Sequence, residues 1–355
     1  MSPFLELFGD RSKFCKQIEH LMSSIDRINN DSSVKEQLDR LRVSIESCIK
    51  ECGRIYIFGS RMYGIAQDNS DVDFYFDPGD CFSGKIAGDR SRQLQLIDLF
   101  IRALENNKEF IGLEVLTTTR VPIVRFFHNT TNFKCDVQFR SGLAVRNSEL
   151  IKLYLSMDER VRWVVSAVKH WAVTFDLIGD DFSTFSVIWL VLFIMMQYKI
   201  VPPIIDLWEK CHNFEPNHIE DWDTSVCFNN DHLMSNMTSK SKNHTKWELL
   251  RFVFEFYSDP NKLQNYVLCT FFGELLPKKK FYSNFITKFS TIDYNYKFQI
   301  NTFEKCKVLV NNNFGNPKRI ELQNPLKLCN NVTAWLNNKN MELFIDLCIK
   351  SAKSM

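Results

Sequence analysis

Hydrophobic residues recur at intervals of three and four over residues 12–50, a pattern that predicts helix. After residue 50 the pattern changes to short apolar runs, rich in β-branched and aromatic residues and bounded by Gly, Asn, Thr or Pro. Such runs predict strands, here at 55–58, 72–76, 121–127 and 133–139. Since a helical pattern covers 93–104, residues 51–140 are expected to form an α+β unit.

The second half of the chain returns to helical periodicity. Asp158 is placed to cap a helix, because a short carboxylate can accept hydrogen bonds from the first free amides. Further helices are predicted over 185–199, 246–257 and 341–350, and a loop over 212–245. The expected fold is α+β with two lobes, and the active site is expected in the cleft between them. The small sheet-containing domain is expected at 51–146 and the larger, mainly helical domain at 1–50 and 147–355.

Composition and charge limit the partners and the cellular compartment that we expect for this protein. A net charge of +2 does not by itself indicate nucleic acid, so any RNA contact must come from local basic residues. The 11 cysteines form no CxxC pair, which is typical of reduced thiols in a cytosolic or nuclear protein. The apolar stretch 185–196 is shorter than the about 20 residues that cross a bilayer, so we expect a core helix and no membrane association. The basic run 278–280 is expected to be a solvated loop.

Three carboxylates and a Gly-Ser turn carry the candidate chemistry. Asp71 and Asp73 lie two apart in a strand and therefore face one side of a sheet. Such pairs are weak evidence, because roughly five are expected by chance among 42 acidic residues. Two further features strengthen the case for a site. Gly59-Ser60 ends the preceding strand, where backbone amides and a hydroxyl can hold phosphate. Asp136 interrupts an apolar strand, where a charge is costly unless it is paired or binds metal. Carboxylate oxygens are ligands that Mg²⁺ and Mn²⁺ prefer.

This arrangement resembles the DNA polymerase β-like nucleotidyltransferase superfamily, which has a Gly-Ser turn, an Asp-x-Asp pair and a later strand aspartate. The resemblance implies that residues 51–146 are the catalytic palm and that two ions, Mg²⁺ or Mn²⁺, act in the site. Asp71 and Asp73 would bridge both ions, and Asp136 would hold the one nearer the attacking 3′-OH. Phosphoryl transfer depends mainly on positioning and charge neutralisation, so no nucleophilic side chain is needed.

Further segments resemble one branch of that superfamily. Residues 142–148 (GLAVRNS) are similar to the LAxxNT element of terminal uridylyltransferases and cytoplasmic-type poly(A) polymerases, and residues 169–171 (KHW) to their KHWA helix. Residues 249–257 resemble a structural helix of this family, and residues 324–332 its base-reading loop. The resemblance covers about residues 50–335, and its order of motifs most resembles an insect terminal uridylyltransferase.

The resemblance also implies roles for single residues. Asn147 would recognise the ribose 2′-OH, Ser148 would contact the nucleotide, and Lys169 would bind the triphosphate. Ser186 stands where the family has a serine beside a base-stacking tyrosine, so it would keep a phosphate contact while the tyrosine is missing. Asn330 replaces the histidine that favours uracil. Because an amide offers both a donor and an acceptor, Asn330 does not distinguish uracil from adenine.

The function implied is template-independent addition of uridines from UTP to RNA 3′ ends. Arg120, which matches an arginine of the family's RVPI strand, and Arg140, close to the site motifs, are the expected RNA contacts. By resemblance, the uridine tails would mark RNAs, including small-RNA precursors, for a 3′-to-5′ exoribonuclease in the cytoplasm. The chain is expected to act as a monomer.

Three alternatives remain open at the level of sequence. A poly(A) polymerase of the same family is compatible with Asn330. An RNA-binding scaffold with a dead site would be expected to lack metal carboxylates, and all three are present here. An oligonucleotide synthetase activated by double-stranded RNA would need a long basic surface, which a net charge of +2 does not suggest.

Overall fold

The structure is a computed structural model that describes residues 8–79, 81–84, 89–117, 121–209, 217–226, 243–292 and 297–355. The chain divides into two compact units. The sheet unit comprises Leu21–Leu153 and Pro216–Thr224, and the helical unit comprises Met1–His20, Tyr154–Glu215 and Ser225–Met355. Of the two expected RNA-contact residues, Arg120 lies outside the described residues. So does most of the expected loop 212–245.

The N-terminal helical pattern forms two helices, α2 (Arg11–Asn30) and α3 (Ser32–Ile49). They separate at Asp31, which has an extended backbone. The Asp31 side chain accepts a hydrogen bond from the Ser33 amide and so caps the start of α3. The predicted stripe on α3 is buried and lies against β1 (Arg54–Phe58). Residues 21–50 therefore belong to the sheet unit, whereas the sequence placed them in the helical domain.

The sheet has five strands in the order β1-β2-β5-β4-β3. The strands after β1 are β2 (Val72–Asp77), β3 (Phe110–Leu116), β4 (Ile123–His128) and β5 (Phe133–Gln138). The β2–β5 pair is parallel and the others are antiparallel. Strand β3 was not predicted, because this edge strand has a register shift near Gly112 and exposes Ile111 and Val115. The predicted α+β class is confirmed.

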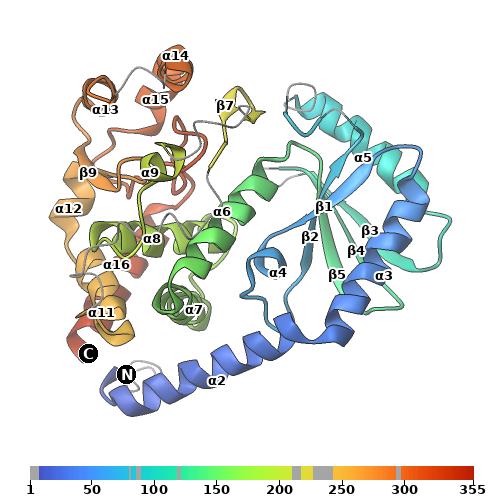
Figure 1. The fold of residues 1–355 in the computed structure, drawn as a ribbon, viewed down its shortest axis with the longest axis horizontal. Helices are drawn as coiled ribbons and strands as arrows, with labels where there is room; N and C mark the ends of the chain where they lie inside the picture. The colour runs from blue at the N-terminus through green and yellow to red at the C-terminus, as the bar shows by residue number, and fades with distance from the viewer. Residues whose placement is uncertain are drawn as a thin grey trace. The chain divides into compact units, whose positions relative to one another are not determined.

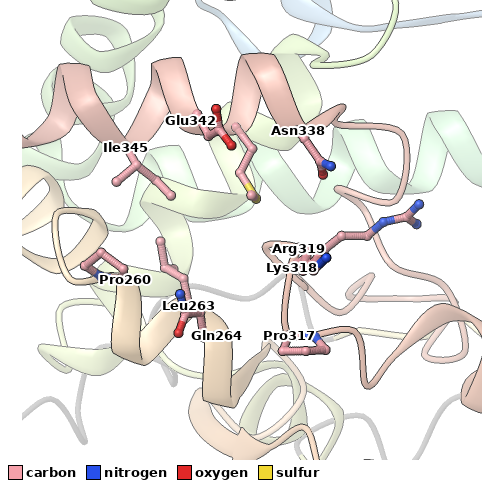
Figure 2. Close-up of a pocket in the computed structure, with 10 residues that line it drawn as sticks. Pro260, Leu263, Gln264, Pro317, Lys318, Arg319, Asn338, Glu342 and Ile345 are labelled. Carbon is pink, nitrogen blue, oxygen red and sulfur yellow. The ribbon is translucent and has the colours of Figure 1, made fainter.

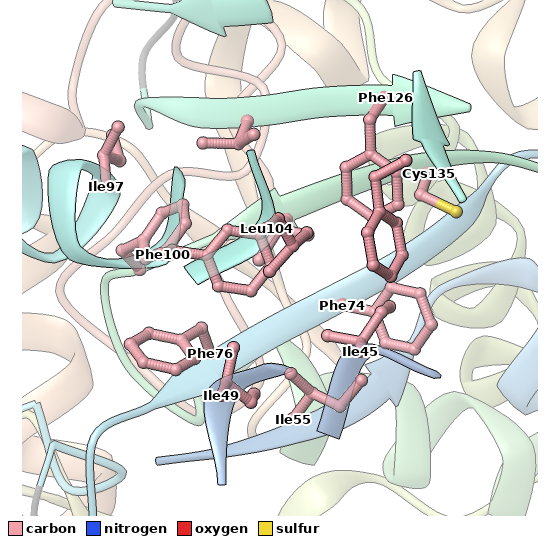
Figure 3. Close-up of a cluster of buried hydrophobic side chains, with 14 of the residues drawn as sticks. Ile45, Ile49, Ile55, Phe74, Phe76, Ile97, Phe100, Leu104, Phe126 and Cys135 are labelled. Carbon is pink, nitrogen blue, oxygen red and sulfur yellow. The ribbon is translucent and has the colours of Figure 1, made fainter. Parts of the chain in front are cut away.

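One face of the sheet is apolar and is covered by two helices. Helix α3 lies against β1, and α5 (Arg90–Leu104) lies against β3 and β4 (Figure 1). Figure 3 shows the side chains that fill this layer, contributed by α3, α5 and the strands. Residues two apart in a strand share a face, so Phe74 and Phe76 point into this core while Asp73 points to the opposite face.

The helical unit is built around α7 (Glu159–Thr174), α8 (Thr184–Gln197), α11 (Lys246–Tyr257) and α16 (Asn338–Ser354). The Asp158 side chain accepts from the Arg160 amide, so the predicted cap of α7 is confirmed. Helix α8 is buried from Ser186 to Met196, as expected of a core helix. None of the helices in the described part of the chain is long and apolar enough to cross a membrane.

Smaller elements complete the two units. Helix α6 (Leu143–Met157) follows β5, and the hairpin of β6 (His218–Ile219) and β7 (Trp222–Asp223) belongs to the sheet unit. The helical unit adds α9 (Ile204–Glu209), α12 (Pro260–Asn265), β8 (Tyr266–Cys269), β9 (Glu274–Pro277), α13 (Phe281–Phe289), α14 (Lys297–Lys305) and α15 (Lys307–Asn313). The expectation of a solvated basic run was wrong for Lys278. Its buried ammonium donates to the carbonyls of Asn316 and Arg319.

We expect Phe100→Ala to lower the free energy of unfolding by about 3–5 kcal/mol, because a buried aromatic ring is lost and a cavity remains. Phe100 is fully buried, and its ring lies 5.4 Å from that of Phe76 and 5.5 Å from that of Phe139. Phe127→Ala is the matched control, because Phe127 is 43% exposed, and its cost should stay within about 1 kcal/mol. Urea unfolding of both variants measures the difference; equal losses would contradict this placement of the core.

Candidate active site

The strand-to-helix turn after β1 is shaped by Gly59. Its backbone has φ 75° and ψ −160°, a region that essentially only glycine adopts, and it is the N-cap of the short helix α4 (Ser60–Tyr63). A Cβ atom at Gly59 would lie 2.1 Å from Oδ2 of Asp73. The turn therefore closes directly against the Asp73 carboxylate only because residue 59 has no side chain.

Ser148 holds this turn in place from α6. Its hydroxyl accepts a hydrogen bond of 2.9 Å from the Gly59 amide and donates one of 2.9 Å to the Ala144 carbonyl. The structure thus brings together two residues that the sequence predicted, Gly59 and Ser148. The Ser148 hydroxyl has a structural role here, which differs from the expected direct contact with a nucleotide.

A row of side chains crosses the open face of the sheet. The strand register places Asp73 opposite Asp136 in the parallel β2–β5 pair, and Asp136 opposite Arg125 of β4. Residues directly opposite each other share a face of the sheet, and like charges in such positions repel. Arg125 offsets this repulsion with two hydrogen bonds of 2.8 Å, from Nε and Nη2 to the two oxygens of Asp136. Hydrogen bonding to Asp136 raises the pKa of Arg125.

The third carboxylate lies just before β2. Oδ2 of Asp71 accepts a hydrogen bond of 2.8 Å from Nζ of Lys134, a residue of β5 two positions before Asp136. Arg61 of α4 donates to the Ser70 carbonyl at 2.7 Å, which ties α4 to the segment that carries Asp71. Burial lowers the pKa of Arg61.

Sequence reasoning missed both side-chain cations on these carboxylates. Lys134 was detectable in part, because its spacing of two from Asp136 places it on the same face of β5. Arg125 was not detectable, because its position opposite Asp136 depends on the register between two strands.

The oxygens present fit a hard divalent cation. Three carboxylates lie in the Asp71–Asp73 segment and on the neighbouring strand β5, and carboxylate oxygens are the ligands that Mg²⁺ and Mn²⁺ take. In the described part of the chain, no three acidic, histidine or cysteine side chains already form a metal-binding group. Convergence of all three aspartates on shared cations therefore stays a prediction.

Asn147, which precedes Ser148 on α6, has a side-chain acceptor without a partner among the described residues. The residue is 8% exposed, and no hydrogen-bond donor among the described residues reaches its side-chain oxygen Oδ1. A buried acceptor without a partner costs about 1–3 kcal/mol, so a ligand hydroxyl that donates to it would be stabilised there. This fits the ribose contact that the sequence predicts for Asn147.

The remaining predicted nucleotide contacts belong to the helical unit. Lys169 is on α7. The hydroxyl of Ser186 lies 3.0 Å from that of the N-cap Ser183 and donates at 3.3 Å to the Val332 carbonyl, so Ser186 joins α8 to the loop that follows Asn330. The backbone of Asn330 donates to the Lys327 carbonyl and accepts from the Asn324 amide.

Arg140 is held by an internal ion pair. Its Nε and Nη2 donate to the two oxygens of Glu220 at 3.0 and 3.1 Å, and Ser141 donates to Oε1 of Glu220 at 2.9 Å. The Glu220 side chain is 9% exposed, so this pair ties the β6–β7 hairpin to the sheet. The structure thus gives Arg140 an internal partner rather than the expected exposure to RNA.

A cavity of about 600 Å³ in the helical unit contains none of the predicted site residues. Figure 2 shows its lining by α12, α16 and the loop that carries Lys318 and Arg319.

A family model matches residues 11–156, the central palm domain of mitochondrial-like poly(A) RNA polymerases. This part of the chain is similar to that palm domain. The matched region contains the Gly59 turn, all three aspartates and Arg125 of β4.

The relatives that the chain matches include terminal uridylyltransferases and poly(A) RNA polymerases, as their names state. Terminal uridylyltransferase 4 of Mus musculus is 23% identical over 255 residues, which cover 68% of this chain and 15% of the relative. Terminal uridylyltransferase cid1 of Schizosaccharomyces pombe is 26% identical over 200 residues, 54% of this chain and 46% of the relative. The match thus spans less than half of either relative.

Solved structures confirm the fold over nearly the whole chain. The crystal structure of mtPAP in complex with GTP superposes with a TM-score of 0.72 at 17% identity, covering 97% of this chain and 70% of that one. At this identity the likeness establishes the fold.

We expect Gly59→Ala to lower the free energy of unfolding more than Gly64→Ala. Gly64 also has a positive φ, of 78°, but a Cβ atom there would meet nothing within 4 Å. Gly64→Ala should therefore lose about 1–2 kcal/mol for its left-handed backbone alone. Gly59→Ala should lose at least about 3 kcal/mol, because its backbone lies in a region that essentially only glycine adopts and the added Cβ atom clashes with Asp73. Equal losses in urea unfolding would show that the turn does not close against Asp73.

Proposed function

We propose that this chain is a template-independent RNA 3′-terminal uridylyltransferase that uses UTP and a divalent metal. The observation that carries the proposal is the pairing of Asp73 with Asp136 across β2 and β5, directly against the Gly59 turn. That combination places two carboxylates beside a turn able to hold phosphate. The match of residues 11–156 to the palm-domain model and the named activities of the relatives support it.

The aspartates would hold two ions, Mg²⁺ or Mn²⁺. Asp71 and Asp73 would contact both, and Asp136 the one nearer the RNA 3′-OH. When bound, the ions supply charge neutralisation for the attacking and leaving oxygens. The bidentate hydrogen bonds from Arg125 orient the Asp136 carboxylate. Ser60 would bind phosphate oxygens at the turn, which Gly59 shapes while its amide donates to Ser148, and Lys169 would bind the triphosphate.

The nucleotide is distinguished by its sugar and its base. Asn147 accepts the ribose 2′-OH at its open oxygen, which favours ribonucleotides. Asn330 contacts the base, and Ser186 supports the loop that presents it. An amide pairs with uracil or adenine, so preference for UTP rests on the resemblance to uridylyltransferases.

RNA 3′ ends are the proposed acceptors, with Arg120 and Arg140 as RNA contacts. Arg140 would have to exchange Glu220 for a phosphate or a base. We further propose that the protein acts in the cytoplasm as a monomer and that its tails direct RNAs to a 3′-to-5′ exoribonuclease.

An extension assay tests this function. Labelled RNA incubated with each of the four nucleoside triphosphates should be extended with UTP at least about tenfold faster than with ATP. Asp136→Asn should lower extension by about 100-fold or more, because one anionic oxygen is lost where positive charge must be held. Asp98→Asn on α5, which breaks only an exposed pair with Arg102, is the matched control and should retain activity.

Two outcomes would count against the proposal. Faster extension with ATP would make the chain a poly(A) polymerase of the same family. Full activity of Asp136→Asn would reject the site assignment.

The role of Asn147 predicts a change in sugar selectivity. Asn147→Ala should reduce the preference for UTP over dUTP by about two- to tenfold, because one hydrogen bond to the 2′-OH is worth about 0.5–1.5 kcal/mol. Asn29→Ala on α2, where the side chain only donates to the Ile25 carbonyl, should leave the ratio unchanged. The ratio of kcat/KM values for UTP and dUTP measures this; an unchanged ratio in Asn147→Ala would remove Asn147 from sugar recognition.

A further inference from the structure

Among the described residues, Arg125 and Lys134 contact two of the carboxylates of the candidate site, and they do so differently. Arg125 binds Asp136 through two hydrogen bonds, and the Asp136 side chain is only 17% exposed. Lys134 binds Asp71 through one hydrogen bond of 2.8 Å, and both side chains are about one-third exposed. A planar guanidinium held at two points is fixed, whereas an ammonium on a flexible stem held at one point can leave toward solvent.

The position of Lys134 follows from the sheet. It lies two residues before Asp136 on β5, and therefore on the same face as Asp136 and as Asp73 opposite it. Without a bound cation, its charge offsets the repulsion among three neighbouring carboxylates. A divalent cation placed at Asp71 would meet a positive charge already there. The two cations therefore compete for one carboxylate.

We propose that Lys134 is a resident counter-ion that neutralises Asp71 in the metal-free protein and is displaced when a divalent cation binds. This inference rests on the proposed metal site. Lys134 therefore raises the metal concentration that is needed to fill the site. In the metal-free protein it also stabilises the sheet. Arg125 stays on Asp136 in both states as a positioning residue.

The test measures binding of Mn²⁺ alone to the whole chain by isothermal titration calorimetry. Lys134→Gln should bind Mn²⁺ about tenfold more tightly than wild type, the size expected when one unit charge is removed close to a divalent ion at a partly exposed site. Lys134→Arg, which keeps the charge, should not bind more tightly than wild type. Lys108→Gln, which removes the charge of an exposed lysine elsewhere in the sheet unit, is the matched control and should bind like wild type.

Thermal unfolding separates competition from a merely structural role. In EDTA, Lys134→Gln should unfold at a lower temperature than wild type, and saturating Mn²⁺ should remove most of that difference. A lysine that only supports the sheet would lower the unfolding temperature equally with and without Mn²⁺, and that result would overturn the inference. If Lys134→Gln does not fold in EDTA, Lys134→Met, which keeps the aliphatic stem, takes its place.

The binding results also distinguish this inference from the proposed function. If wild type binds Mn²⁺ and Lys134→Gln binds it equally or more weakly, the counter-ion role is overturned and the proposed metal site stands. No Mn²⁺ binding by wild type would overturn both.

Discussion

The parallel pairing of β2 with β5 is the constraint on which the rest of the sheet unit depends. It places Asp73 directly beside Asp136, an arrangement that costs free energy because two carboxylates face each other. The fold accommodates this cost locally. Gly59 leaves space for the Asp73 carboxylate, and Arg125 binds both oxygens of Asp136 from the next strand.

The apolar face of the same strands enforces this register. Phe74 alternates with Asp73 on β2, and Val137 alternates with Asp136 on β5, and both apolar side chains are fully buried. A shift of one residue in either strand would turn an aspartate into the core and a large apolar side chain into solvent. Burial on one face therefore determines which charges meet on the other, so stability and the candidate chemistry share one set of strands.

Several polar residues that looked like ligand contacts have internal partners. Ser148 holds the Gly59 turn, Ser186 joins α8 to the loop at Val332, and Arg140 is paired with Glu220. Buried polar groups require hydrogen-bond partners, and the chain supplies these from segments distant in sequence. Asn147 is different, since its side-chain oxygen has no donor among the described residues, and the proposed ribose contact would supply one.

The sequence by itself determined what depends on neighbours along the chain. The α3 stripe and four of the five sheet strands follow from periods of 3.6 or 2 residues, and the cap at Asp158 follows from a short carboxylate just before a helical pattern. Only the tertiary structure decided which residues meet across strands and loops: Arg125 with Asp136, Lys134 with Asp71, the edge strand β3, and the burial of Lys278. The reason is physical, because local periodicity specifies the face on which a side chain lies, whereas its partner depends on the register and packing of distant segments.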